Sequence, residues 1–166
     1  NENISLLEIV FFASTNAQIK ERISGYIKDL AEFKDEKLKI DLLELYTLVN
    51  YTSSCGIPAT MDMLYFYFGD LIENYEDIIY ALKKMNKIIV ETTDEELKID
   101  ESQDYLIMRS KLFAEKSIFL IPPEIFAHVL EKFLDKVSPH AIYRYDIFKR
   151  KAYDADFTRR AFSKTR

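Results

Sequence analysis

Glycine, proline and cysteine are scarce in this sequence of 166 residues, which contains three Gly, four Pro, one Cys and no Trp. An all-β fold needs many tight turns, and glycine and proline supply the backbone geometry of most of them. The scarcity therefore favours helices. The single cysteine, Cys55, excludes a disulfide within the chain and fits a reducing compartment. Because no histidine lies near it in sequence, we interpret Cys55 as a small buried side chain and not as a nucleophile.

Long apolar runs are lacking as well. No stretch reaches the roughly eighteen apolar residues that a membrane span needs, so we expect no membrane contact and a cytoplasmic protein. Hydrophobic residues nevertheless make up 48% of the chain, with 12 Phe and 11 Tyr among them, which is enough for a core of ordinary size. The chain opens with Asn1 and not with Met, and we expect it to be a piece of a longer protein.

Charge is unevenly distributed along the chain. The formal net charge is -5. Residues 140–166 contain eight Lys or Arg and three Asp or Glu, a net charge of +5, whereas the remainder carries 15 basic and 25 acidic residues, a net charge of -10. The sequence therefore predicts an acidic body with a basic tail.

Helical periodicity and capping residues predict a mainly α-helical fold. Thr60, Asn74 and Ser110 are expected to cap three of the helices, and Gly56 to end another in the left-handed conformation. The predicted helices cover residues 3–12, about 17–33, about 38–53, 61–68, 75–86, 110–119, 123–134 and 140–162, the last one broken near Asp154. The inner face of the helix over 75–86 is predicted to carry Ile78, Ile79, Leu82 and Met85.

Three stretches, KIIVET at 87–92, LKID at 97–100 after an acidic turn and DYLIMR at 104–109, predict two or three short strands joined by polar turns. Three helices followed by such a hairpin is the order of a winged helix. We therefore expect a winged-helix domain over residues 37–109, preceded by helices in 1–36 and followed by a helical segment in 110–166.

Three stretches carry a family resemblance: GIPATMDMLYFYFG, YEDIIYALKKMNKIIVET and LIMRSKLFAEKSIF. They are similar to the winged-helix region of STAND-type P-loop NTPases, which are signal-transducing ATPases of the AAA+ group. The resemblance covers roughly residues 6–134. It implies that residues 1–36 are lid-like helices and that residues 110–166 begin a sensor or repeat region. It also implies an interdomain relay through Arg109 and Glu115, which follow the wing.

The sequence departs from that family in lacking any phosphate-binding loop of the pattern GxxxxGKS or GxxxxGKT. We therefore expect no catalytic or cofactor-binding residue in this chain, and any ATP or ADP would belong to the rest of the parent protein. The two histidines, His128 and His140, have no Cys, His or paired carboxylates at metal-ligand spacing, so no metal site is expected. His128 is interpreted as a partly exposed, hydrogen-bonded side chain.

DNA binding by the predicted winged helix is disfavoured by charge. The start of its third helix carries Glu73, Glu76 and Asp77, and the predicted wing tip carries acidic residues at 94–96. Affinity for DNA comes mostly from Lys and Arg that neutralise phosphates. Both elements that would touch DNA have the opposite sign, so we expect a protein partner, either another domain of the same protein or a separate chain.

The basic tail leaves three interpretations open. It could bind nucleic acid, it could pack its aromatic residues on the helices before it while the bases stay in water, or it could bind an acidic partner, including the acidic body of another copy of this chain. The oligomeric state does not follow from the sequence. The candidate interaction residues of the tail are Tyr143, Arg144, Lys149, Arg150, Arg159 and Arg160.

The function predicted from these observations is that of a non-catalytic regulatory or interaction segment of a larger signal-transducing NTPase. The alternative is a winged-helix protein that binds nucleic acid through its basic tail.

Overall fold

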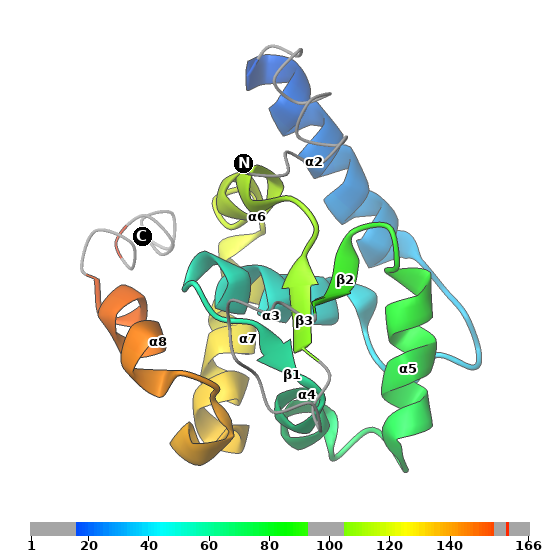
Figure 1. Cartoon of the computed structure of the whole chain (residues 1–166). Helices are drawn as coiled ribbons and strands as arrows, with labels where there is room; N and C mark the ends of the chain where they lie inside the picture. Colours follow the sequence, from blue (N-terminus) through cyan, green and yellow to red (C-terminus); the bar gives the residue numbers. More distant parts are fainter. Residues whose placement is uncertain (1–15, 93–104, 155–158, 160–166) are drawn as a thin grey trace.

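The computed structural model describes residues 16–92, 105–154 and residue 159. In these residues the fold is mainly helical, with one small antiparallel sheet (Figure 1). The elements, in chain order, are α2 (Asn16–Glu32), α3 (Leu42–Ser54), β1 (Ala59–Thr60), α4 (Met61–Phe68), α5 (Tyr75–Lys84), β2 (Ile89–Thr92), β3 (Tyr105–Met108), α6 (Lys111–Ser117), α7 (Pro123–Lys136), the 3-10 turn η2 (Pro139–Ala141) and α8 (Tyr145–Ala152).

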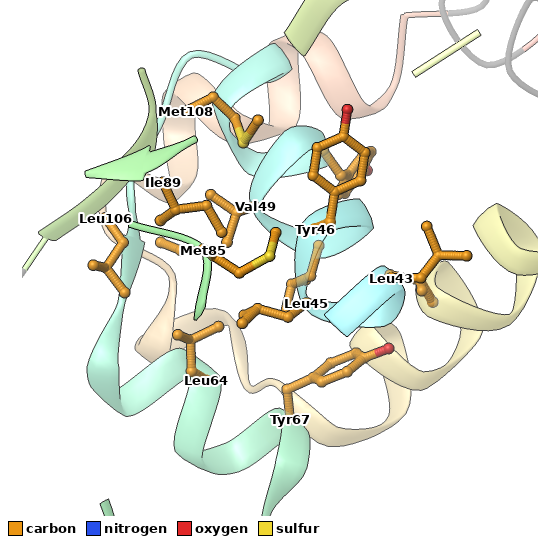
Figure 2. Close-up of a cluster of buried hydrophobic side chains, with 14 of the residues drawn as sticks. Leu43, Leu45, Tyr46, Val49, Leu64, Tyr67, Met85, Ile89, Leu106 and Met108 are labelled. Atoms are coloured by element: carbon orange, nitrogen blue, oxygen red, sulfur yellow. The ribbon is translucent and has the colours of Figure 1, made fainter. Parts of the chain in front are cut away.

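Helix α3 is the centre of the core. Every residue from Leu42 to Thr52 except Glu44 is buried, because α2, α6, α7 and the sheet surround the helix. Figure 2 shows Leu45 and Val49 of α3 among buried side chains that come from several elements, Leu64 of α4 and Ile89 of β2 included. A helix that is apolar on all sides has to be covered on all sides, and α3 meets this requirement.

The sheet has three antiparallel strands in the order β1-β3-β2. Val90 of β2 lies opposite Ile107 of β3, and Ala59 of β1 lies opposite Leu106. The strands β2 and β3 lie where the sequence predicts them. The two-residue strand β1 was not predicted, because so short a segment has no periodicity of its own.

The predicted capping residues are confirmed. Thr60 Oγ1 accepts a hydrogen bond from the Met63 amide (3.1 Å), Asn74 Oδ1 from the Glu76 amide (3.0 Å) and Ser110 Oγ from the Phe113 amide (3.1 Å). Gly56 has a φ of 78°, the left-handed conformation expected after α3.

Several predicted helix boundaries and faces were wrong. Helix α3 begins at Leu42 and not near Leu38, because Asp41 caps it by accepting the Glu44 amide (2.9 Å). Helix α5 ends at Lys84, two residues early. Ile79, which was predicted to face inward, is 43% exposed.

Within the described part of the helix predicted over 140–162, the α-helix begins only at Tyr145, as α8. Pro139 to Ala141 form a 3-10 turn, and Arg144 adopts φ 50° and ψ 55°. A left-handed residue cannot continue a right-handed helix, so the chain changes direction at Arg144. Helix α8 ends at Ala152, which agrees with the break expected near Asp154. The helix predicted over 3–12, the acidic wing tip at 94–96 and the stretch LKID at 97–100 lie outside the described residues.

Candidate functional site

The solvent-facing side of α4 and α5 is aromatic and acidic. The Tyr75 ring stacks on the Tyr65 ring with centroids 4.7 Å apart, and the Tyr75 hydroxyl donates a hydrogen bond to Asp62 Oδ1 (2.9 Å). Phe66 of α4 and Ile79 of α5 are exposed on the same two helices. Glu76, in the first turn of α5, is exposed too. The arrangement presents a surface in which apolar area and carboxylates are mixed.

The other two carboxylates that were predicted to face a DNA groove are held by Lys39, in the loop before α3. Lys39 Nζ lies 3.1 Å from Glu73 Oε1 and 3.5 Å from Asp77 Oδ2, and Asp77 also accepts the Glu73 amide (3.0 Å). That amide hydrogen bond and the Lys39 ammonium lower the pKa of the Asp77 carboxyl. The negative charge at the start of α5 is therefore partly neutralised from a loop far away in sequence.

The aromatic residues of the tail pack within the protein. The Tyr143 ring lies edge-on to the Tyr105 ring of β3, with centroids 5.1 Å apart. The guanidinium carbon of Arg144 is 5.6 Å from the Tyr143 centroid, and Lys149 Nζ is 5.2 Å from the Tyr145 centroid. Phe148 is buried against Tyr51 of α3. These contacts support the interpretation in which the tail's aromatic residues pack on the body.

The basic residues of the tail remain at the surface. Lys149, Arg150 and Arg159 are exposed, while Arg160 lies outside the described residues. Arg150 and Lys151 line an open groove of about 710 Å³ between the end of α3, helix α6 and helix α8. Ile118, Phe119 and Ile147 supply its apolar part.

The two predicted relay residues, Arg109 and Glu115, have different surroundings. The Arg109 side chain donates a hydrogen bond to the backbone carbonyl of Asn86 (3.1 Å), which holds the end of β3 to the segment after α5. Glu115 is exposed on α6 and lines the same groove as Arg150. Glu115 and the tail residue Arg150 thus line one groove, and Arg109 makes a local contact.

A half-buried polar cluster between α3, α4 and α7 was missed by the sequence reasoning. Glu44 Oε1 accepts hydrogen bonds from the Tyr67 hydroxyl (2.7 Å) and from Lys132 Nζ (2.9 Å). His128 Nε2 is 3.4 Å from the same oxygen, and the exposed His128 side chain fits the interpretation given to it. Lys132 Nζ also lies 4.5 Å from the Tyr67 centroid and 5.1 Å from the Phe68 centroid. The sequence feature that could have indicated this cluster is Lys132, which stands beside the apolar residues of α7 that are buried, Phe126, Val129 and Phe133.

Burial governs the remaining titratable groups. Burial raises the pKa of the Cys55 thiol to about 12, and Cys55 is buried as expected. Burial and the hydrogen bond to Glu44 raise the pKa of the Tyr67 hydroxyl. Both groups are neutral near pH 7 and neither has the properties of an activated nucleophile or base.

Residues 16–92 and 105–154 offer neither a metal-binding cluster nor a membrane-spanning helix. This part of the chain holds no group of three or more His, Cys, Asp or Glu that could bind a metal ion. None of its helices has the length and hydropathy that a bilayer-spanning segment requires.

Comparison of the chain with protein-family models, with curated proteins and with solved structures found no match.

Proposed function

We propose that this chain is a non-catalytic interaction segment, built around a winged helix, of a larger signal-transducing NTPase. The order of elements from α3 to β3 supports the winged-helix part. Three helices (α3, α4, α5) lead into two antiparallel strands, and a short strand before α4 pairs with β3. In this proposal α2 belongs to the lid-like segment, and α6 to α8 begin the sensor or repeat region.

The exposed face of α5 is the observation that carries the proposal. That face presents Tyr75, Glu76, Ile79 and Lys83, which is two large apolar side chains, one carboxylate and one cation. No Lys or Arg occurs between Met61 and Leu82. A helix that enters a DNA groove relies on cations around it to neutralise phosphates. An exposed face that is mainly apolar, with one carboxylate and one cation, is better suited to another protein surface.

A DNA titration tests the choice between protein and nucleic acid. Fluorescence anisotropy of a labelled duplex would be followed with the 166-residue chain at about 20 mM and about 200 mM salt. We expect no saturable binding at either salt concentration. Binding at low salt that weakens steeply as salt rises, and that is lost when Arg159 and Arg160 are replaced by Ala, would establish the nucleic-acid alternative in its place.

The NTPase part of the proposal has a separate test in the full reading frame that encodes the chain. A phosphate-binding loop encoded before Asn1 is the expected result. A complete reading frame without such a loop would remove the proposed family while leaving the interaction role to the binding experiments.

A further inference from the structure

Two exposed faces of the molecule have opposite charge. The first, the α4–α5 face, consists of Asp62, Phe66, Tyr75, Glu76 and Ile79. Its members are contiguous: Phe66 is one helical turn from Asp62, Asp62 accepts the Tyr75 hydroxyl, and Ile79 is one turn beyond Tyr75. Phe66 is 52% exposed. Asp62 and Glu76 make this face negative, and Lys83, one helical turn beyond Ile79, is an exposed cation at its edge.

The second, the α8 face, consists of Lys149, Arg150 and Tyr153. These residues are three and four positions apart and so share one side of the helix and its C-terminal cap. Tyr153 is 74% exposed. Asp146 lies one turn earlier on the same side, but residues 144–154 contain four basic and two acidic residues, so the segment stays positive.

The α5 part of the first face and the α8 face lie apart in the molecule, whereas Asp62 and Phe66 of α4 line a hollow with His140 and Tyr143, just before α8. Helices α5 and α8 lie on opposite sides of the body, with α3 and the sheet between them (Figure 1). Each face combines exposed aromatic surface with charge, which is the composition that favours burial in an interface over simple solvation.

We propose that copies of this chain associate head to tail, with the α8 face of one copy docked on the α4–α5 face of the next. The proposal rests on the interaction role proposed above and names a second copy as the partner. A polyanion would complement the α8 face but would leave the apolar α4–α5 face in water. A second copy complements both faces with one kind of contact.

The contact joins two different surfaces, so it does not close at a dimer. Every added copy leaves one unused face of each kind, and the assembly grows unless the geometry closes it into a ring. Sedimentation equilibrium of the 166-residue chain, from about 5 to about 500 µM, should therefore show a weight-average mass that keeps rising with concentration. Because the attraction is between exposed charges, the apparent Kd should weaken about tenfold between roughly 50 and 500 mM salt.

Charge reversal on each face provides the decisive experiment. Lys149→Glu/Arg150→Glu makes the α8 face negative, and Asp62→Lys/Glu76→Lys makes the α4–α5 face positive. Each variant alone should remain monomeric, since like charges then face each other. An equimolar mixture should associate again, because the two reversed faces attract each other and the two unchanged faces still do. Lys20→Glu/Lys28→Glu on α2 changes the net charge by the same amount as the first variant and should associate like the parent chain.

Circular dichroism of each variant shows whether it is folded, and the α8 variant, which alters only exposed side chains, keeps the test usable if the other one unfolds. A parent chain that stays monomeric at all concentrations in low salt, or a mixture that stays monomeric, overturns the head-to-tail contact. A monomer that also fails to bind duplex DNA leaves the interaction role intact. A monomer that binds DNA overturns both proposals.

Discussion

The polar cluster around Glu44 gives the sharpest prediction for stability. Glu44 and Lys132 join α3 to α7, and the Tyr67 hydroxyl joins α4 to the same carboxylate. The Glu44 side chain is only 13% exposed and that of Lys132 only 17%. Replacing Glu44 by Gln keeps the volume and an acceptor for Tyr67, but it leaves the ammonium of Lys132 without its counter-charge.

Removing one partner of a fully buried ion pair costs about 3–5 kcal/mol. Because both side chains retain some contact with water, we expect Glu44→Gln to cost about 2 kcal/mol. Glu44→Ala should cost about 1 kcal/mol more, since the Tyr67 hydroxyl then loses its acceptor. With a urea m-value of about 2 kcal/mol/M, the Gln variant should shift the unfolding midpoint down by about 1 M with m unchanged.

A double-mutant cycle with Lys132→Met tests whether the ion pair is the cause. The methionine keeps apolar contact with the Tyr67 and Phe68 rings. The double variant should be more stable than the sum of the single effects predicts, by about 1–2 kcal/mol. The exposed pair Asp70–Lys136, which joins the turn after α4 to α7, is the matched control, and Asp70→Asn should cost less than about 1 kcal/mol. Additive single effects, or a Glu44→Gln cost no larger than that of Asp70→Asn, would refute the reasoning.

Three further predictions concern single positions. Gly56→Ala should destabilise the chain by about 1–2 kcal/mol because an alanine is strained at a φ of 78°, and not because of a clash, since the nearest atom would lie an ordinary 3.7 Å from the added Cβ. Gly25→Ala, in open space on α2, should instead stabilise the chain by about 0.5–1 kcal/mol. Thermal unfolding measures both. Cys55, whose pKa burial raises to about 12, should react with iodoacetamide at least about a hundredfold more slowly in native buffer than in urea; equal rates would contradict its burial. The Tyr80 hydroxyl donates a hydrogen bond to Asp35 and is the main cause that lowers the pKa of this carboxyl below its usual value. The stability that Asp35 contributes is therefore present above the usual pKa and is lost as pH falls through the lowered pKa. The difference in unfolding free energy between the parent chain and Asp35→Asn should therefore shrink from about pH 6 to about pH 2.5, and a constant difference would show that the carboxylate is not held in this way.

Local chemistry explains what the sequence predicts well. Thr60, Asn74 and Ser110 each cap a helix by accepting an amide two or three residues ahead, so the residues concerned are visible in a short window of sequence. The same holds for Gly56, whose left-handed conformation follows from its place after a helix. These positions set where α4, α5 and α6 begin, and they were predicted correctly.

Contacts between distant segments explain what was missed. The strand β1 exists only because β3, more than forty residues later, pairs with it. The helical spacing of apolar residues in the tail runs past Arg144 without interruption and so predicts one helix there. Ile142 and Phe148, before and after Arg144, are both buried against residues from other parts of the chain, and the chain turns at Arg144 between them. The Glu44 cluster joins residues 23 and 88 positions apart. No local pattern carries information over such separations.

The charge of the candidate site shows the same limit in a form that bears on function. Counting residues assigns five carboxylates to segment 61–82 and suggests a strongly negative surface. Three of them have partners from elsewhere in the chain, since Lys39 holds Glu73 and Asp77 and Lys136 lies 2.7 Å from Asp70. The surface left on α4 and α5 is therefore less acidic and more apolar than its sequence. Association through apolar area depends little on salt, whereas association through exposed charge weakens as salt rises. The salt dependence of any association at this face therefore measures how much of its negative charge the internal ion pairs neutralise.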